Sequence, residues 1–93
     1  MNLKDYQTII EKTAVYPKEL GIAYCALGLN DEFGEFIEKI RMDASLKDIT
    51  KESGDVWWYM TALSSELNIK MEDVLENSLK YGYNEDVLPV YYL

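Results

Sequence analysis

The chain has 93 residues, of which 48% are hydrophobic, and 17 acidic against 9 basic side chains give it a net charge of -8. This length suits one domain over residues 1–93 and leaves no room for a second core. The negative charge excludes general binding to nucleic acid, although a phosphate ligand could still bind through a bridging cation. Histidine is absent and Cys25 is the single cysteine, which excludes an internal disulfide, structural zinc and histidine-based catalysis.

The beginning of the chain, Met1–Asp5, has neither the basic nor the apolar region of a signal peptide. No apolar run reaches the roughly 18 residues that a membrane span needs. We therefore expect a cytoplasmic protein with no membrane partner. Because so short and apolar a chain would leave hydrophobic surface uncovered as a single copy, we also expect a homodimer or homotetramer.

Helical periodicity runs through the first half of the chain. The spacing of apolar residues predicts a first helix over Leu3–Tyr16, which Pro17 ends. A second helix is expected to begin at Glu19 or later and to run to Arg41, with Gly21 making its start uncertain.

The second half of the chain continues the same pattern. A third helix is predicted over Leu46–Leu67, with Ser45 as its N-cap and Asn68 ending it in the left-handed conformation. A fourth is predicted over Met71–Tyr81, and the tail, residues 83–93, is expected to be extended. Short connections between four helices favour an all-α, antiparallel four-helix bundle.

The second and third predicted helices each carry one apolar stripe, and the two stripes are expected to pack against each other in the core. The stripes are formed by Leu29, Phe33, Phe36, Ile37 and Ile40 in the second helix, and by Ile49, Val56, Met60, Leu63 and Leu67 in the third.

The same two helices share a repeat of paired acids. Glu32 and Glu35 in the second helix, like Glu52 and Asp55 in the third, are three residues apart and lie on the same flank of the apolar stripe. One such pair would usually be part of a solvated face, but two pairs at matching positions favour a site. When antiparallel helices pack stripe to stripe, the two flanks can converge and direct four carboxylates into one pocket.

Four adjacent carboxylates cannot all stay ionised without a cation. Oxygen ligands alone suit Mg²⁺, with Mn²⁺ as the alternative, and the lack of histidine excludes a di-iron bundle. A glycine precedes the second acid of each pair, and glycine in a helix interior costs roughly 1 kcal/mol relative to alanine. Gly34 and Gly54 therefore predict a close approach by a neighbouring helix or a ligand.

These acid pairs and their surroundings resemble the MazG-like nucleoside triphosphate pyrophosphohydrolases of the all-α NTP pyrophosphatase superfamily. The resemblance covers roughly Tyr6 to Lys80 and includes the segments Gly54–Tyr59 and Met71–Val74. It implies an enzyme that hydrolyses nucleoside triphosphates, usually dNTPs, to the monophosphate and pyrophosphate with Mg²⁺, in control of the nucleotide pool. Phosphoribosyl-ATP pyrophosphatases and dimeric dUTPases are related, and the short length argues against the longer dUTPases.

The resemblance also implies roles for individual residues. The four paired acids would hold the metal, and Glu35 is preferred to Asp31 and Glu38 as the general base. Tyr59 would face the nucleobase, with a core aromatic as the alternative. The remaining implied contacts to substrate are Asn77 and Lys80 to phosphate or sugar, with a surface charge as the alternative for Lys80, and Gln7 to the base.

One departure leaves a second class of function open. Family members often have an arginine shortly after the lysine of the last helix, whereas this chain has none in Tyr81–Asp86. The alternative hypothesis is therefore a helical interaction module that has kept the fold and lost catalysis.

Overall fold

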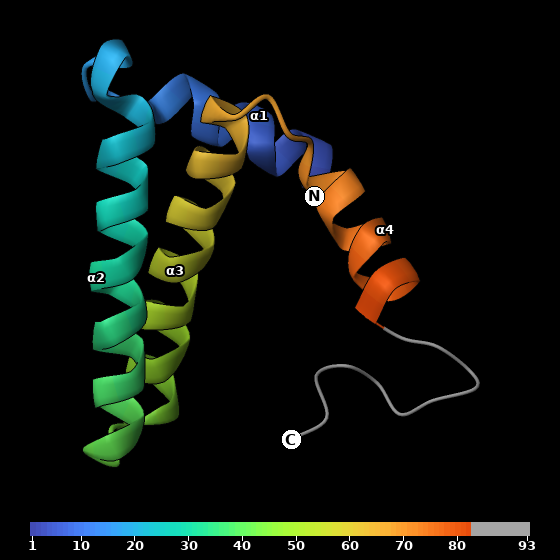
Figure 1. Ribbon diagram of the computed structural model, residues 1–93. Coiled ribbons are helices and arrows are strands. Elements are labelled where there is room, and N and C mark those ends of the chain that lie inside the picture. The colour runs from blue at the N-terminus through green and yellow to red at the C-terminus, as the bar shows by residue number, and fades with distance from the viewer. Residues whose placement is uncertain (83–93) are drawn as a thin grey trace.

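The computed structural model of the protein describes residues 1–82, which form four α-helices and one short 3-10 turn without any β-strand (Figure 1). This finding confirms the all-α class, and the tail over residues 83–93 lies outside the described part. The elements in chain order are α1 (Leu3–Thr13), η1 (Lys18–Leu20), α2 (Gly21–Arg41), α3 (Leu46–Glu66) and α4 (Met71–Gly82).

The helix ends follow local chemistry. The Ser45 hydroxyl accepts a hydrogen bond from the Asp48 N–H at 3.2 Å, and Asn68 is left-handed with φ 58°, both as predicted. α1 ends at Thr13, three residues before the predicted end at Tyr16, because the backbone is extended at Ala14. The Tyr16 ring therefore lies outside the helix. That ring stacks on Tyr24 of α2, with ring centroids 4.9 Å apart.

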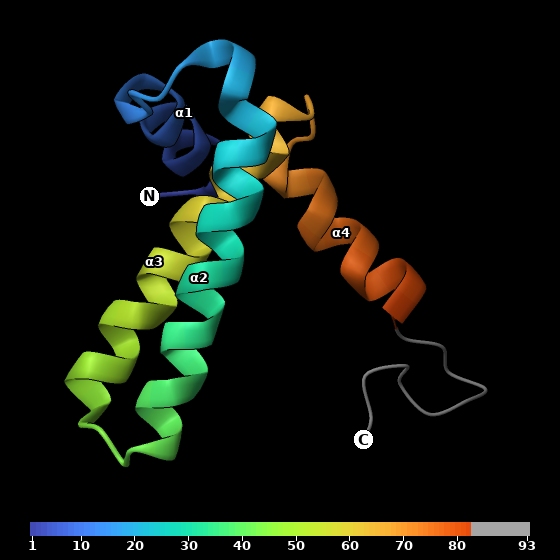
Figure 2. The same cartoon turned by 60° about the vertical axis from the view of Figure 1, so that its left-hand side comes forward.

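α2 and α3 form an antiparallel hairpin along which they lie side by side (Figures 1 and 2). At the two glycines of this contact, an added Cβ would overlap the facing side chain, so glycine permits the close approach. The contacts step backwards along α3 as they step forwards along α2: Gly21 meets Glu66, Cys25 packs with Ala62, and Gly28 meets the Tyr59 ring.

The core lies at one end of the hairpin, where α1 packs across α3. Ile10 of α1, Cys25 of α2 and Ala62 of α3 are buried there. We call the side of the hairpin that α1 covers the α1 side. Partly buried hydrophobic residues surround this cluster, namely Tyr6, Tyr16, Trp58 and Leu63.

The prediction that the two apolar stripes form the core of one chain is wrong. None of the ten stripe residues is buried, and Phe33 and Ile40 are 52% and 50% exposed. The reason is that α2 and α3 meet along their glycines, which leaves the stripes beside the contact. Met60 lies about 200° around α3 from Ala62, which faces α1. Leu63 is the exception, since it packs against the core cluster, and we call the surface formed by the other nine stripe residues the apolar face.

The four helices therefore do not close into a bundle within one chain. α4 packs against α1 near its beginning and then diverges from the hairpin in both views (Figures 1 and 2). In Figure 2, α1 and α4 leave the hairpin on opposite sides.

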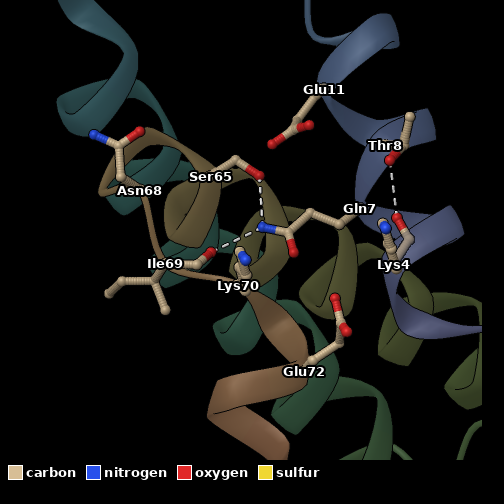
Figure 3. A pocket seen from close by; sticks show the side chains of 9 residues that line it. All are labelled: Lys4, Gln7, Thr8, Glu11, Ser65, Asn68, Ile69, Lys70 and Glu72. Carbon is tan, nitrogen blue, oxygen red and sulfur yellow. Dashed lines mark hydrogen bonds between the residues drawn. The ribbon is translucent and has the colours of Figure 1, made fainter.

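A buried amide connects the beginning of α4 to the remainder of the chain. Gln7 of α1 donates two hydrogen bonds of 2.9 Å, to Ser65 Oγ and to the Ile69 carbonyl (Figure 3). Its Oε1 accepts a third, of 2.8 Å, from the Met71 N–H. We call this group of contacts the Gln7 clamp.

The close contact of the hairpin can be tested with two glycine variants. Gly28→Ala places a methyl group against the Tyr59 ring, and we expect it to lower the free energy of unfolding by about 1–3 kcal/mol. Gly34→Ala is the matched control, since nothing lies within 4 Å of its added Cβ, and should raise stability by up to about 1 kcal/mol. Urea unfolding followed by circular dichroism measures both, and equal losses would contradict the proposed role of Gly28.

Candidate metal centre

The structure brings the paired acids together where α2 and α3 meet. The hairpin register places Glu32 opposite Asp55 and Glu35 opposite Glu52. Carboxylate oxygens of Glu32, Glu52 and Asp55 lie within 4.8 Å of one another, and we call these residues the three-acid cluster. Glu35 stands outside this group and is exposed.

The three-acid cluster lies in the helix contact itself and not only on its flank. Glu32 continues the α2 contact line one turn beyond Gly28, and Glu52 is buried with 8% of its surface exposed. The alternative explanation for these acids was a solvent-exposed helix surface. Glu52 does not fit that explanation, because it is buried. Asp55 is seven residues before Ala62 and therefore faces the α1 side.

The electrostatics of the cluster are unfavourable for three free carboxylates. Burial raises the pKa of Glu32, and the neighbouring charges of Glu35, Asp55 and Glu52 raise it further. Glu32 Oε2 and Glu52 Oε2 are buried without a hydrogen-bond partner among the described residues. A buried acceptor without a partner costs about 1–3 kcal/mol, and more when it is charged. A divalent cation would satisfy both oxygens, and an all-oxygen donor set fits Mg²⁺ or Mn²⁺.

The glycines beside the acids have a different environment from the one predicted. Beyond the adjoining residues and the local backbone of the same helix, no atom of the described residues lies within 4 Å of a Cβ built at Gly34 or Gly54, so no other described helix approaches them closely. The glycines that are closely approached are Gly21 and Gly28, which sequence reasoning did not assign to the helix contact. The sequence feature that indicates this contact is a series of small residues at helical spacing, Gly21, Cys25 and Gly28, which Glu32 follows one turn later.

Tyr59 lies next to the acids. Its ring covers Gly28 and lies 6.2 Å from the ring of Tyr24, measured between centroids. Hydrogen bonding to Tyr24, burial and nearby charges that include Glu32 raise the pKa of Tyr59 to about 12. Tyr24 is a neighbour of the site that sequence reasoning missed, although it lies two helical turns before Glu32 on the same side of α2.

Three residues predicted to contact substrate are not gathered with the acids of their own chain. Asn77 and Lys80 are exposed on α4, which diverges from the hairpin (Figure 2). The expected base contact of Gln7 is corrected, because the Gln7 side chain is buried and both of its amide N–H groups and its carbonyl bond to the protein. Gln7 therefore has a structural role.

The protein is thus of the all-α class, with an antiparallel helical hairpin whose carboxylates from both helices could hold a divalent cation. A family profile described as the MazG nucleotide pyrophosphohydrolase domain matches residues 23–81, which include all four paired acids. The chain belongs to this family, as its resemblance predicts.

Comparison with other proteins agrees with this assignment. The chain is similar to Gene 37 protein of Mycobacterium phage L5, with 30% identity over 85% of this chain and 83% of that protein. No solved structure matches the chain. Among the helices that the structure describes, none is long and apolar enough to cross a membrane.

Replacing the buried acid tests the electrostatics of the cluster. Without metal, Glu52→Gln removes one buried charge and should raise the thermal midpoint. In the unmutated protein, Mg²⁺ at about 100 times its dissociation constant should add about 2.7 kcal/mol of stability, and the variant should lose most of this gain. Glu76→Gln removes an exposed charge from α4 and is the control. If both variants respond equally to Mg²⁺ in differential scanning calorimetry, Glu52 is not a ligand.

The raised pKa of Glu32 predicts how the metal-free protein responds to pH. Folded Glu32 holds its proton more tightly than unfolded glutamate, so its ionisation destabilises the fold as pH rises through the raised pKa. This contribution disappears below the unfolded pKa of about 4.3. We expect stability to increase as pH falls through the raised pKa of Glu32, with a smaller slope in Glu32→Gln. Equal slopes in urea unfolding of the two proteins would contradict this origin.

Proposed function

We propose that this protein hydrolyses nucleoside triphosphates, with dNTPs as the expected substrates, to the monophosphate and pyrophosphate in the presence of Mg²⁺. The observation that carries the proposal is the three-acid cluster with its two unpartnered buried oxygens, in a chain of the MazG family. We further propose that it acts in control of the cytoplasmic nucleotide pool.

Each of the four acids has a proposed task. Glu32, Glu52 and Asp55 would hold the metal between the helices. Glu35, which is exposed beside them, would be the fourth ligand. A Mg²⁺ ion held by these residues would neutralise charge on the triphosphate and activate the attacking water.

The exposed position of Glu35 also suits it to act as the general base. Its carboxylate is close enough to raise the pKa of Glu32, yet it lies outside the three-acid cluster and open to solvent. There it can accept a proton from the water that attacks the α-phosphorus, while the bond to the β-phosphate breaks and pyrophosphate leaves.

The remaining substrate contacts are assigned by position. Tyr59 is the proposed neighbour of the nucleobase, because its ring lies beside the acids and is only partly buried. For Asn77 and Lys80, the contact with phosphate or sugar stays a prediction. α4 diverges from the hairpin of its own chain (Figure 2), which separates these two residues from the acids.

We propose a homodimer in which the apolar faces of two hairpins meet. This arrangement would bury side chains such as Phe33 and Ile40 and would complete a four-helix bundle from two α2–α3 hairpins. The acids would remain accessible, since Asp55 faces the α1 side.

The enzyme proposal is tested by pyrophosphate release from each nucleotide with Mg²⁺. Glu35→Gln should lower kcat by at least about 100-fold, the smaller end of the usual contribution of a general base. Glu38→Gln and Asp31→Asn, the two rival bases on the same helix, should keep kcat within a few-fold. A larger loss in either would move the assignment to that residue.

The same assay separates the enzyme from the interaction module. If no nucleotide yields pyrophosphate while the protein is folded and dimeric, catalysis has been lost and the module is the better description. The absence of an arginine in Tyr81–Asp86 is the sequence feature that favours this second reading.

A further inference from the structure

Three tyrosine rings form a row that leads away from the three-acid cluster. The row begins at Tyr59 of α3, which lies one helical turn after Asp55 and whose pKa responds to the charge of Glu32. The ring centroid of Tyr59 lies 6.2 Å from that of Tyr24 on α2, and the centroids of Tyr24 and Tyr16 are 4.9 Å apart. Both spacings are typical of aromatic rings in contact. We call these three residues the tyrosine row.

The end of the tyrosine row that is remote from the acids is anchored. The Tyr16 hydroxyl donates a hydrogen bond of 3.2 Å to Glu66 Oε2 at the end of α3. A Cβ added at Gly21 would meet both the Glu66 carboxylate and the Tyr16 ring, so these two side chains pack against the beginning of α2. Tyr16 therefore has a fixed position, although it lies between α1 and η1 and outside both.

Tyr24 depends on this anchor for its own position. Tyr24 is 47% exposed, and an exposed side chain on a helix surface changes rotamer quickly unless a neighbour holds it. The Tyr16 ring is such a neighbour, because it stacks on the Tyr24 ring with 13° between the two ring planes. Stacked aromatic pairs attract each other beyond the area that they bury. The stack therefore holds Tyr24 in the orientation in which it meets Tyr59.

The Tyr59 ring is in turn restricted by Tyr24. Tyr59 lies over Gly28, which has no side chain of its own to hold the ring. Tyr24 lies one turn before Gly28 on α2, and its ring meets the Tyr59 ring at an angle of 37°. Trp58 contacts Tyr59 from within α3, with 72° between the ring planes. Tyr24 therefore limits the rotation of the Tyr59 ring from the α2 side.

An ordered Tyr59 ring would favour the binding of substrate without changing the chemical step. A side chain that is ordered before a ligand arrives loses no rotamer freedom on binding, and for one side chain this is worth about 2- to 10-fold in affinity. In the proposed function, the acids act on the triphosphate and Tyr59 is the neighbour of the nucleobase. Loss of order in Tyr59 should therefore weaken the binding of nucleotides and leave the rate of bond cleavage unchanged.

We infer that Tyr24 is a positioning residue, which orders the Tyr59 ring for the nucleobase and so favours a nucleotide over a bare polyphosphate. Tyr16 and Glu66 support Tyr24 from the remote end of the tyrosine row. The inference rests on the proposed function, because it takes Tyr59 as the neighbour of the base. It adds to that function a source of selectivity that lies outside the acids.

Binding of dNTP analogues with an imido group between the α- and β-phosphates tests this role in the full chain with Mg²⁺. Tyr24→Leu removes the ring and should raise the dissociation constant about 2- to 10-fold. Tyr24→Phe keeps both ring contacts and should restore the binding. Ile22→Ala is the matched control, since Ile22 is 52% exposed and lies about 200° around α2 from Tyr24. Equal dissociation constants for Tyr24→Leu and the unmutated protein in isothermal titration calorimetry would overturn the inference.

Inorganic tripolyphosphate separates an effect on the base from damage to the site. It carries the phosphate chain without a base, so Tyr24→Leu should bind it with Mg²⁺ as tightly as the unmutated protein does. An equal loss of affinity for tripolyphosphate and for the dNTP analogue would show that the variant disturbs the acids, and the inference would be wrong. Tyr16→Leu, which removes the stack outside the helices, should weaken binding of the analogue alone in the same way.

Kinetics separate the failure of the inference from the failure of the proposed function. In pyrophosphate release, Tyr24→Leu should raise KM while kcat stays within about twofold of its unmutated value. If the unmutated protein binds the analogue but releases no pyrophosphate from any dNTP, the proposed function fails, and the dissociation constants still decide the role of Tyr24. If kcat falls while the dissociation constant is unchanged, the positioning role is rejected and the proposed function stands.

Discussion

The close contact between α2 and α3 is the constraint on which the site depends. Two glycines, Gly21 and Gly28, let side chains of α3 reach the backbone of α2. This contact sets the register of the hairpin, and the register in turn brings Glu32 opposite Asp55. A larger residue at Gly28 would move the helices apart at the point from which the acids are positioned.

The same contact creates an electrostatic cost, which the proposed metal site would explain. Stable cores exclude unpaired carboxylates, yet Glu32 and Glu52 each bury an oxygen without a partner among the described residues. A divalent cation bound between the helices would offset the cost of these unpartnered oxygens. The chain belongs to a nucleotide pyrophosphohydrolase family, which agrees with a cation site at this position.

The hairpin also separates two kinds of chemistry onto two sides. The α1 side carries the core, whereas side chains of the apolar face such as Phe33 and Ile40 remain exposed. A chain of 93 residues cannot bury all its apolar surface alone. The proposed association on one side and the proposed substrate site on the other would allow both functions in a small domain.

Sequence periodicity by itself determined the helices, the caps at Ser45 and Asn68, and the pairing of the four acids. These features depend on interactions between residues only a few positions apart, so they can be predicted from the sequence. Periodicity shows which residues share a side of a helix, but it does not show which side meets a neighbour. Only the tertiary structure decided that the helices meet along glycines and acids instead of the large apolar stripes, because that choice depends on how closely two backbones can approach. For the same reason the direction of α4 and the burial of Gln7 became visible only in the folded chain.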